Sequence, residues 1–416
     1  MNKADLSDAF AQQLLPKPPS KLGVAVSGGG DSMALLSLAA IFAEEHGIEL
    51  HVISIDHGLR ADAYQELKLV TQMCADIGCQ HHLEYWSGWD GGGNLQDRAR
   101  VARYELMGDW AAGNGISVVL LGHTANDQAE TLMMRLARGA GVDGLSAMSA
   151  RRMQNGVTWV RPLLGITRRD LRSYLQSEGL VWAEDPSNED RDYERIRMRD
   201  ALRILEPLGF STENLTAVAD QMSQARAALN WQTFLAAREV VEVSHGAVCF
   251  NMKVYRTLPV EISRRLLVHA LGWLSNAEYP PRRNAVEVAR HSIREGVGHT
   301  LHGCQIQREG NTLWIYREFN AIKDLTSDIG DAWDDRWYVE GEEEDPVYRV
   351  RALGADGLAQ IKDWRELGVP RAALMVTPGV FLNGELIAAP AVEDTDEWSV
   401  ELEGGANGFF GALLSH

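Results

Sequence analysis

The sequence contains only four cysteines in 416 residues, and no two of them form a C-x-x-C pair. They stand at Cys74, Cys79, Cys249 and Cys304. This scatter argues against a zinc site and against a thiol redox motif, because both need closely spaced sulfur ligands. We therefore expect four reduced structural thiols.

Long apolar runs are missing as well. No run approaches the roughly 20 residues needed to span a bilayer, and the first 20 residues lack the uninterrupted apolar core of a signal peptide. We expect a cytoplasmic protein with no membrane partner. A hydrophobic content of 45% with 24% charged residues indicates globular domains, and 416 residues are enough for two or three of them.

Positive charge is scarce, because 40 basic residues face 58 acidic ones and the net charge is -18. Spread evenly, this charge would exclude a nucleic-acid partner. However, residues 321–416 alone carry 20 acids and 7 bases, whereas six arginines and one acid fall within 151–172, and seven arginines and three glutamates within 256–294. Such segments can hold phosphates while the remaining surface repels them. The alternative is that the arginines of these two segments are scattered over the surface and exposed to solvent, without forming a phosphate-binding patch.

Strand patterns alternate with helical patterns between residues 21 and 164. Strands are expected at 22–26, 49–55, 81–86, 116–122 and 158–163, and helices near 32–46, 62–77, 95–113 and 126–138. This alternation predicts an α/β fold with a doubly wound parallel sheet, in which ligands bind at the carboxyl ends of the strands.

The rest of the chain changes character. After about residue 165 the pattern becomes helical, with a hairpin expected around 309–311, and residues 324–345 look like an acidic linker or solvated rim. A small β-rich domain is expected at the end. We predict three domains: a catalytic domain over 1–208, a mainly helical middle domain over 209–323, and an acidic domain over 324–416.

The segment Ser27-Gly28-Gly29-Gly30-Asp31-Ser32 follows an expected strand and opens an expected helix. Glycines there let backbone N–H groups converge, and the helix N-terminus adds positive charge, so the segment predicts an anion site. It lacks the lysine of a Walker A loop and does not fit G-x-G-x-x-G. The alternative is a glycine-rich turn in which Asp31 merely caps the helix.

Two further groups carry chemistry. Asp127 and Glu130 lie three apart on an expected helix, so both carboxylates share one face, where they can hold magnesium or grip the ammonium groups of an amino substrate. A solvated helix face is the alternative. Arg100 and Arg103 lie at helical spacing and could together face a phosphate. The alternative is that both are exposed arginines on a helix surface.

These motifs resemble known enzymes. SGGGDS matches the S-G-G-x-D-S loop of the N-type ATP pyrophosphatases (PP-loop enzymes). The motifs D-H-G-L-R, N-x-[EQ]-x-x-A-R-x-x-R-Y, L-G-H-x-x-x-D-Q-x-E-T, G-L-x-x-M, R-P-L-L and D-P-S-N follow in the order and spacing of the tRNA(Ile)-lysidine synthetases. The resemblance is dense over residues 21–203, and residues 362–390 give a weaker echo of that family's C-terminal domain.

This resemblance implies a two-step ligase. ATP would adenylate the C2 oxygen of the wobble cytidine in an isoleucine tRNA with a CAU anticodon, and the ε-amino group of L-lysine would then displace AMP to give lysidine. Mg²⁺ would be held by Asp31 and Asp127. The catalytic residues would be Asp31, Asp127, Glu130 and His123. The ATP-binding residues would be Ser27, Gly28, Gly29, Gly30, Asp31, Ser32, Asp56, His57 and Arg60. The substrate-binding residues would be Arg100, Arg103, Arg161, Arg195 and Arg199.

Some positions depart from the family pattern. Ile196 stands where the family has an asparagine, Gln96 where glutamate is usual, and Thr124 where a second histidine is common. A homodimer is one option for the assembly. A tRNA thiolase of the same superfamily would need a sulfur carrier, a nucleophilic cysteine or a C-x-x-C cluster, and a non-catalytic adenine-nucleotide-binding protein would not need Asp127 and Glu130 beside the loop.

Overall fold

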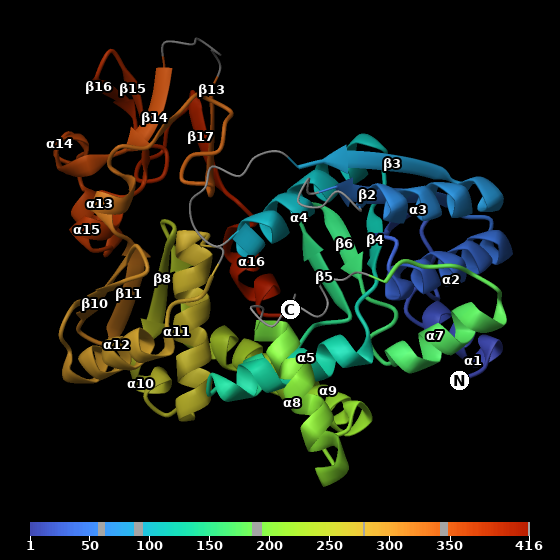
Figure 1. Cartoon of the computed structure of the whole chain (residues 1–416). Coiled ribbons are helices and arrows are strands. Elements are labelled where there is room, and N and C mark those ends of the chain that lie inside the picture. The colour runs from blue at the N-terminus through green and yellow to red at the C-terminus, as the bar shows by residue number, and fades with distance from the viewer. Residues whose placement is uncertain (57–62, 87–94, 185–193, 278, 342–347, 415–416) are drawn as a thin grey trace. The chain divides into compact units, whose positions relative to one another are not determined.

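A computed structural model of the chain describes residues 1–56, 63–86, 95–184, 194–277, 279–341 and 348–414 (Figure 1). The chain divides into two units, Met1–Arg226 and Ala227–His416. The boundary falls inside one long helix, α9, which runs from Thr212 to Val240. The expected division into three domains stays a prediction.

The first unit contains a six-stranded sheet with helices around it. Its elements are α1 (Lys3–Ala11), β1 (Lys21–Ala25), α2 (Gly30–His46), β2 (Glu49–Asp56), α3 (Ala63–Ile77), β3 (Gln80–Tyr85), α4 (Leu95–Gly113), β4 (Val118–Leu121), α5 (Ala125–Ala137), α6 (Val142–Leu145), β5 (Arg151–Gln154), β6 (Val157–Val160), α7 (Arg168–Ser177), α8 (Glu194–Leu205), the short 3₁₀ turn η2 (Glu206–Leu208) and the first part of α9.

The strands lie in the order β3-β2-β1-β4-β6-β5. All neighbours run parallel except β5, which pairs antiparallel with β6 through a tight turn at Asn155 and Gly156. Both turn residues have positive φ, 52° and 73°, which is the geometry that Asn-Gly favours in a two-residue hairpin. The five expected strands are confirmed, whereas this hairpin strand was not expected.

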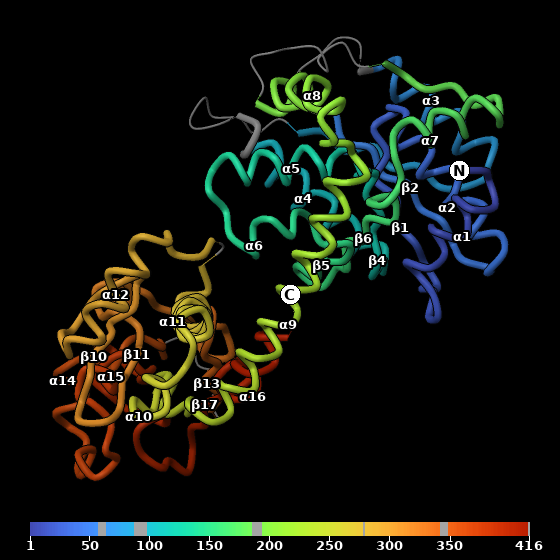
Figure 2. The backbone as a smooth tube through the Cα atoms, turned by 90° about the horizontal axis from the view of Figure 1, so that it is seen from below, coloured from blue at the N-terminus to red at the C-terminus, as the bar shows by residue number. Residues whose placement is uncertain are grey.

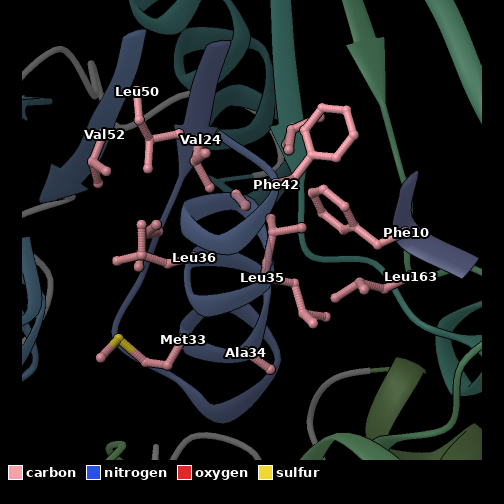
Figure 3. Packing of buried hydrophobic residues seen from close by; sticks show 14 of the residues in the cluster. Phe10, Val24, Met33, Ala34, Leu35, Leu36, Phe42, Leu50, Val52 and Leu163 are labelled. Atoms are coloured by element: carbon pink, nitrogen blue, oxygen red, sulfur yellow. The ribbon is translucent and has the colours of Figure 1, made fainter. Parts of the chain in front are cut away.

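Both faces of the sheet are covered, as a doubly wound fold requires. Leu22 and Val24 of β1 point to the face that packs against α2, where Phe42 and Leu35 complete the buried cluster (Figure 3). Gly23, between them, points to the opposite face, and a methyl group there would lie 3.1 Å from the Trp110 ring of α4. Helices therefore cover the sheet on both sides, and the predicted fold class is confirmed.

The second unit combines helices with antiparallel sheets. Its elements after α9 are β7 (Val241–Ser244), β8 (Ala247–Asn251), α10 (Met252–Tyr255), α11 (Val260–Ser275), α12 (Arg283–Glu295), β9 (His299–Leu301), β10 (Cys304–Glu309), β11 (Thr312–Arg317), α13 (Phe319–Ile322), β12 (Thr326–Ser327), β13 (Trp337–Gly341), β14 (Tyr348–Ala352), α14 (Gly354–Leu358), η3 (Trp364–Leu367), α15 (Arg371–Leu374), β15 (Pro378–Leu382), β16 (Glu385–Ala388), β17 (Trp398–Leu402) and α16 (Gly405–Ala412).

The hairpin expected around 309–311 is confirmed as β10 and β11, within a sheet of order β7-β8-β11-β10-β9. The last part of the chain forms a four-stranded sheet, β12-β14-β15-β16, and the pair β13-β17. The final helix α16 packs into the core formed by α11, α12 and the sheet β7-β8-β11-β10-β9. There Phe409 is fully buried, and its carbonyl oxygen lies 2.7 Å from Nε2 of His269 on α11.

The expectation of an acidic linker over 324–345 is wrong for its described part, whereas the alternative of a solvated rim agrees with its acidic side chains, most of which are exposed. This stretch contributes β12 and β13, and Trp333 and Trp337 are buried in the core. Asp334 accepts hydrogen bonds from Nε and Nη2 of Arg317 at 2.8 and 2.7 Å. The many acids in this stretch predict a solvated segment, but the two buried tryptophans pack it against the rest of the unit.

Across the described ranges, we find no helix that is both long enough and apolar enough to cross a bilayer.

The glycine loop lies between β1 and α2, at the carboxyl end of a central strand. Gly28 has φ of +89°, and a β-carbon there would stand 2.9 Å from the carbonyl oxygen of Glu66 on α3. Gly29 is the N-cap of α2 with φ of -73°, and the nearest atom to a β-carbon there is Ser27 Oγ, 3.7 Å away. The backbone geometry therefore requires a glycine at position 28 but not at position 29.

We expect Gly28→Ala to destabilise the protein by about 1–3 kcal/mol, because it adds left-handed strain to a clash with the backbone. Gly29→Ala is the matched control, with a smaller expected loss of about 0.5–1 kcal/mol, because alanine is less favourable than glycine at an N-cap but meets no clash or left-handed strain here. Urea unfolding followed by circular dichroism compares the two. Equal losses would contradict the placement of the loop.

Candidate functional site

The loop presents an anion-binding backbone at the start of α2. The hydroxyl of Ser32 accepts a hydrogen bond from the Ser27 N–H at 3.1 Å and donates one to the Gly29 carbonyl at 2.9 Å. No side chain caps α2 at Gly29. Gly29 also forms a parallel bridge with Ala183, whose N–H donates to the Gly28 carbonyl at 3.0 Å. The start of this 17-residue helix therefore has no side-chain cap, which suits the anion site that the sequence predicts.

The second part of the site stands at the end of β4, the strand next to β1. Thr124 begins α5, and both its N–H and its hydroxyl donate to Oδ2 of Asp127 at 2.8 Å. The family's second histidine is replaced here by a residue that caps the helix. Asp127 and Glu130 are buried, at 6% and 1% exposure, so the alternative of a solvated helix face is wrong.

Arg168, the first residue of α7, joins the two parts. Its Nε donates to Asp31 at 2.9 Å and its Nη1 donates to Glu130 at 2.9 Å, while Nη2 donates to Asp127. One guanidinium therefore contacts all three of the predicted catalytic carboxylates. The sequence placed Arg168 only in a basic segment, and its spacing from the other motifs carried no signal of this role.

Backbone contacts fix where Arg168 starts. Its own N–H donates to the side-chain oxygen of Asn126 at 2.9 Å, and the N–H of Ala125 donates to the carbonyl of Ile166 at 2.9 Å. These bonds tie the beginning of α7 to the beginning of α5. The arginine is therefore held at the carboxylates by main-chain geometry as well as by charge.

Two arginines of α8 reach the same carboxylates. Arg195 donates from Nε to Glu130 at 2.7 Å and from Nη2 to Asp127 at 3.1 Å, and Arg199 donates from Nε to Glu130 at 2.9 Å. The structure thus brings these two predicted substrate-binding arginines into the site. Ile196, in place of the family asparagine, is buried on the same helix.

The two aspartates experience opposite environments. Burial raises the pKa of Asp31, and the Arg168 guanidinium opposes this only in part. Burial also acts to raise the pKa of Asp127, but Arg168 and Arg195 together hold that pKa below its ordinary value. Asp127 therefore stays ionised, whereas Asp31 takes up a proton more readily, and such divergence is common at functional sites.

His123 lies just after β4 and stays neutral. Burial, with a further contribution from the neighbouring Arg161 and Arg103, lowers the pKa of His123 to about 3, although Asp127 opposes the shift. Its buried Nδ1 has no hydrogen-bond partner among the described residues. A neutral imidazole can stand beside Asp127 without competing for it as a cation.

A third group of predicted residues gathers around Tyr104 of α4. Arg161 donates to the Tyr104 hydroxyl at 3.4 Å and to the Ser149 carbonyl at 2.8 Å, and the Arg100 guanidinium lies 5.4 Å from the centre of the Tyr104 ring. Burial lowers the pKa of Arg103, whose Nε is buried with no partner in the described structure. These arginines form a cationic cluster around Tyr104, in which Arg161 is buried and Arg100 is exposed, so that for Arg100 the alternative of an exposed helix arginine holds. Arg161 and Arg103 lie close enough to His123 to lower its pKa.

Not every predicted residue can be placed. Asp56 ends β2, and its carbonyl accepts a hydrogen bond from the Trp86 N–H at 2.9 Å. His57, Arg60 and the segment 185–188 lie outside the described residues. The four cysteines are unpaired, and Cys74, Cys249 and Cys304 are buried.

The arrangement suits a cation between Asp31 and Asp127, because a single guanidinium now reaches both. In the described part of the chain, no cluster of three or more His, Cys, Asp and Glu side chains forms a ready metal cage. Two carboxylates are nevertheless the usual protein share of a magnesium site, whose other ligands are phosphate oxygens and waters.

We expect Arg168→Gln to lower the free energy of unfolding by about 3 kcal/mol at neutral pH, because it leaves buried carboxylates with less positive charge. The lowered pKa of Asp127 gives stability that is present above the unfolded pKa and lost as pH falls through the folded one. In the variant the pKa of Asp127 rises. The difference in free energy of unfolding between the variant and the unsubstituted protein should therefore become smaller as pH falls from 7 towards 4.

Arg172→Gln is the matched control on the same helix. Arg172 pairs with Glu184 at 3.1 Å, and both side chains are more than half exposed, so its loss should change stability by less than about 1 kcal/mol. Guanidinium chloride unfolding at several pH values measures both variants. If the loss of unfolding free energy caused by Arg168→Gln does not depend on pH, Arg168 does not stabilise the protein through the charge of these carboxylates.

Comparison with known proteins agrees with this geometry. A family described as the PP-loop domain matches residues 2–205. A tRNA(Ile)-lysidine synthase of Ruegeria pomeroyi is 48% identical over 415 residues, 99% of this chain and 98% of the relative. One of Wolbachia pipientis wMel is 33% identical over 76% of each chain.

Among solved structures, the U34-tRNA thiolase NcsA of Methanococcus maripaludis, described with its 4Fe-4S cluster, is similar at a TM-score of 0.47 and 15% identity. The match covers 53% of this chain and 78% of the thiolase. This similarity is too low to bear on the chemistry. Because a relative at 48% identity spans nearly the whole of both chains, the chain belongs to the tRNA(Ile)-lysidine synthase family.

Proposed function

We propose that the protein ligates L-lysine to C2 of the wobble cytidine in an isoleucine tRNA with a CAU anticodon, using ATP and giving lysidine, AMP and pyrophosphate. The observation that carries the proposal is the convergence of Asp31, Asp127 and Glu130 on one guanidinium beside the glycine loop. This site offers an anion position next to a cation position, as an enzyme that joins ATP and an amine needs.

The anion position is the loop. ATP would place its β,γ-pyrophosphate against the glycine loop, residues 27–32, where α2 begins without a side-chain cap. The C2 oxygen of cytidine would attack the α-phosphorus, the bond to the bridging oxygen would break, and pyrophosphate would leave. The loop would stabilise the negative charge that develops on that leaving group.

The cation position lies between the carboxylates. Asp31 and Asp127 would hold Mg²⁺, which would neutralise phosphate oxygens when bound, and Asp127 with Glu130 would attract the lysine ε-ammonium. Arg168 contacts all three carboxylates, so it must give them up when these cations arrive. Its guanidinium is then free to pair with a phosphate.

Proton movement completes the second step. The ε-ammonium must lose a proton before its nitrogen attacks C2, and Asp127 or Glu130 can accept it. As the new carbon–nitrogen bond forms, the bond from C2 to the adenylate oxygen breaks and AMP leaves. His123 stays neutral beside Asp127, since its pKa is lowered to about 3, and so it does not displace the substrate ammonium.

The arginines beside Tyr104 suit the polyanionic substrate. Arg100, Arg103 and Arg161 gather around the Tyr104 ring, the last two near His123, and would hold phosphates next to the wobble cytidine. The thiolase alternative has less support, because three of the four cysteines are buried and the sequence has no C-x-x-C pair.

The assay that tests this function mixes the protein with ATP, magnesium, radiolabelled lysine and an isoleucine tRNA transcript bearing CAU. We expect acid-precipitable label and AMP in equal amounts, and no label when the wobble cytidine is changed to uridine. AMP without incorporated lysine would leave an ATP pyrophosphatase with another nucleophile. No AMP at all would favour a non-catalytic nucleotide-binding protein.

A second test concerns the carboxylates. We expect Asp127→Asn to lower kcat/KM for lysine by about 100-fold or more, because it removes charge from the cation position and a candidate proton acceptor. Asp109→Asn, on the exposed side of α4, changes charge equally and should keep its activity within about twofold. The lysine incorporation assay compares them, and equal activities would remove Asp127 from the mechanism.

A further inference from the structure

A basic hollow lies in the second unit, apart from the residues of the site described above. It holds about 80 Å³ of water-accessible space and is formed by α10, the start of α11 and the end of α12, which lie together in Figures 1 and 2. Its lining residues are Met252, Tyr255, Arg256, Leu258, Val260, Ser263, Arg290, Ile293 and Arg294. Three of these nine side chains are arginines, and none is acidic.

The acids of this region are already paired. Glu261 binds Arg264 and Arg265, Glu287 binds Arg290, and Glu295 binds His291. Glu278 lies outside the described residues. The arginine pair at 264 and 265, which the sequence counts as part of a basic segment, therefore shares one glutamate of its own helix, which offsets part of its charge.

Two arginines of the hollow have no such partner. Arg256 and Arg294 are exposed and form no ion pair within the described structure, where the positive charge on each is left to solvent or to a ligand. Arg290, beneath them, is only 6% exposed, and its Nη2 donates to the Ser263 hydroxyl at 3.3 Å. The hollow therefore has at its rim two cationic groups without an ion-pair partner in the described structure, above an Arg290 that is already paired with Glu287.

The start of α11 adds to this potential. Its N-cap is Pro259, which supplies no side-chain hydrogen bond, so the first N–H groups of a 16-residue helix are uncapped. Val260 and Ser263 from this first turn line the hollow. The partial positive charge of a helix N-terminus thus reinforces the arginines at the same place.

We propose that this hollow binds a phosphate group of the tRNA backbone. Arginine suits the position because its planar guanidinium makes paired hydrogen bonds to phosphate oxygens. The inference rests on the proposed function for the identity of the RNA, whereas the affinity for phosphate follows from the hollow itself. In a protein of net charge -18, a confined basic site also fixes where a polyanion docks.

The test compares two double variants with equal charge change. Arg256→Gln with Arg294→Gln removes the rim of the hollow, and Arg282→Gln with Arg283→Gln removes two arginines from the opposite end of α12. Binding of the fluorescently labelled CAU isoleucine tRNA transcript is followed by anisotropy over a range of potassium chloride concentrations. Circular dichroism checks that both variants are folded.

We expect the hollow variant to bind about tenfold more weakly at low salt and to lose about one to two units of the slope of log Kd against log salt, since each phosphate contact contributes about 0.7–0.9. The α12-start variant should keep most of the slope. Equal changes in both variants, or none in the hollow variant, would overturn the proposal.

Inorganic phosphate distinguishes a local site from a diffuse charge. At equal ionic strength it should weaken tRNA binding to the unsubstituted protein more than chloride does, and the hollow variant should lose this excess. If the protein forms lysidine but the hollow variant binds tRNA normally, only this inference fails. If no lysidine forms and the binding loss is still seen, the proposed function fails and the phosphate site stands.

Discussion

The contact of one guanidinium with three carboxylates organises the catalytic unit. Adjacent parallel strands β1 and β4 end at the same edge of the sheet, so the helices that follow them bring Asp31 and Asp127 close together. Two ionised carboxylates placed so close together, one buried and one partly buried, would repel each other. Arg168, placed by backbone hydrogen bonds between α5 and α7, makes the arrangement stable.

The same contact explains how a site can be stable when empty and still accept charged substrates. Three arginines and three carboxylates leave the group with little net charge, so neither set is buried alone. A ligand that brings both an anion and a cation can replace these pairs on both sides: its phosphates take the guanidinium groups, and its cations take the carboxylates. Under the proposed reaction, ATP with magnesium and then lysine supply those charges.

The sequence allowed much of this to be predicted, and the misses have physical causes. The loop at 27–32 and the pair Asp127 and Glu130 depend on short-range spacing, which a sequence displays directly. Arg168 lies 137 residues from Asp31, and only the folded sheet brings them together. The strand β5 was missed although Asn155-Gly156 is a hairpin signal, and β13 was missed because buried Trp333 and Trp337 stand among acids.

Charge counts mislead in a similar way, since pairing decides which arginines can bind a ligand. Seven arginines between 256 and 294 read as one basic segment, yet Arg264, Arg265 and Arg290 are each held by a glutamate within four residues on their own helix. Such local pairs form whether or not RNA is present, so they add little to the attraction for phosphate. Arg256 follows α10 and Arg294 lies near the end of α12; neither forms an ion pair within the described residues, and they line one hollow only in the folded unit. Where an acidic protein can hold RNA is therefore set by tertiary structure, which brings such arginines together, rather than by the number of arginines it contains.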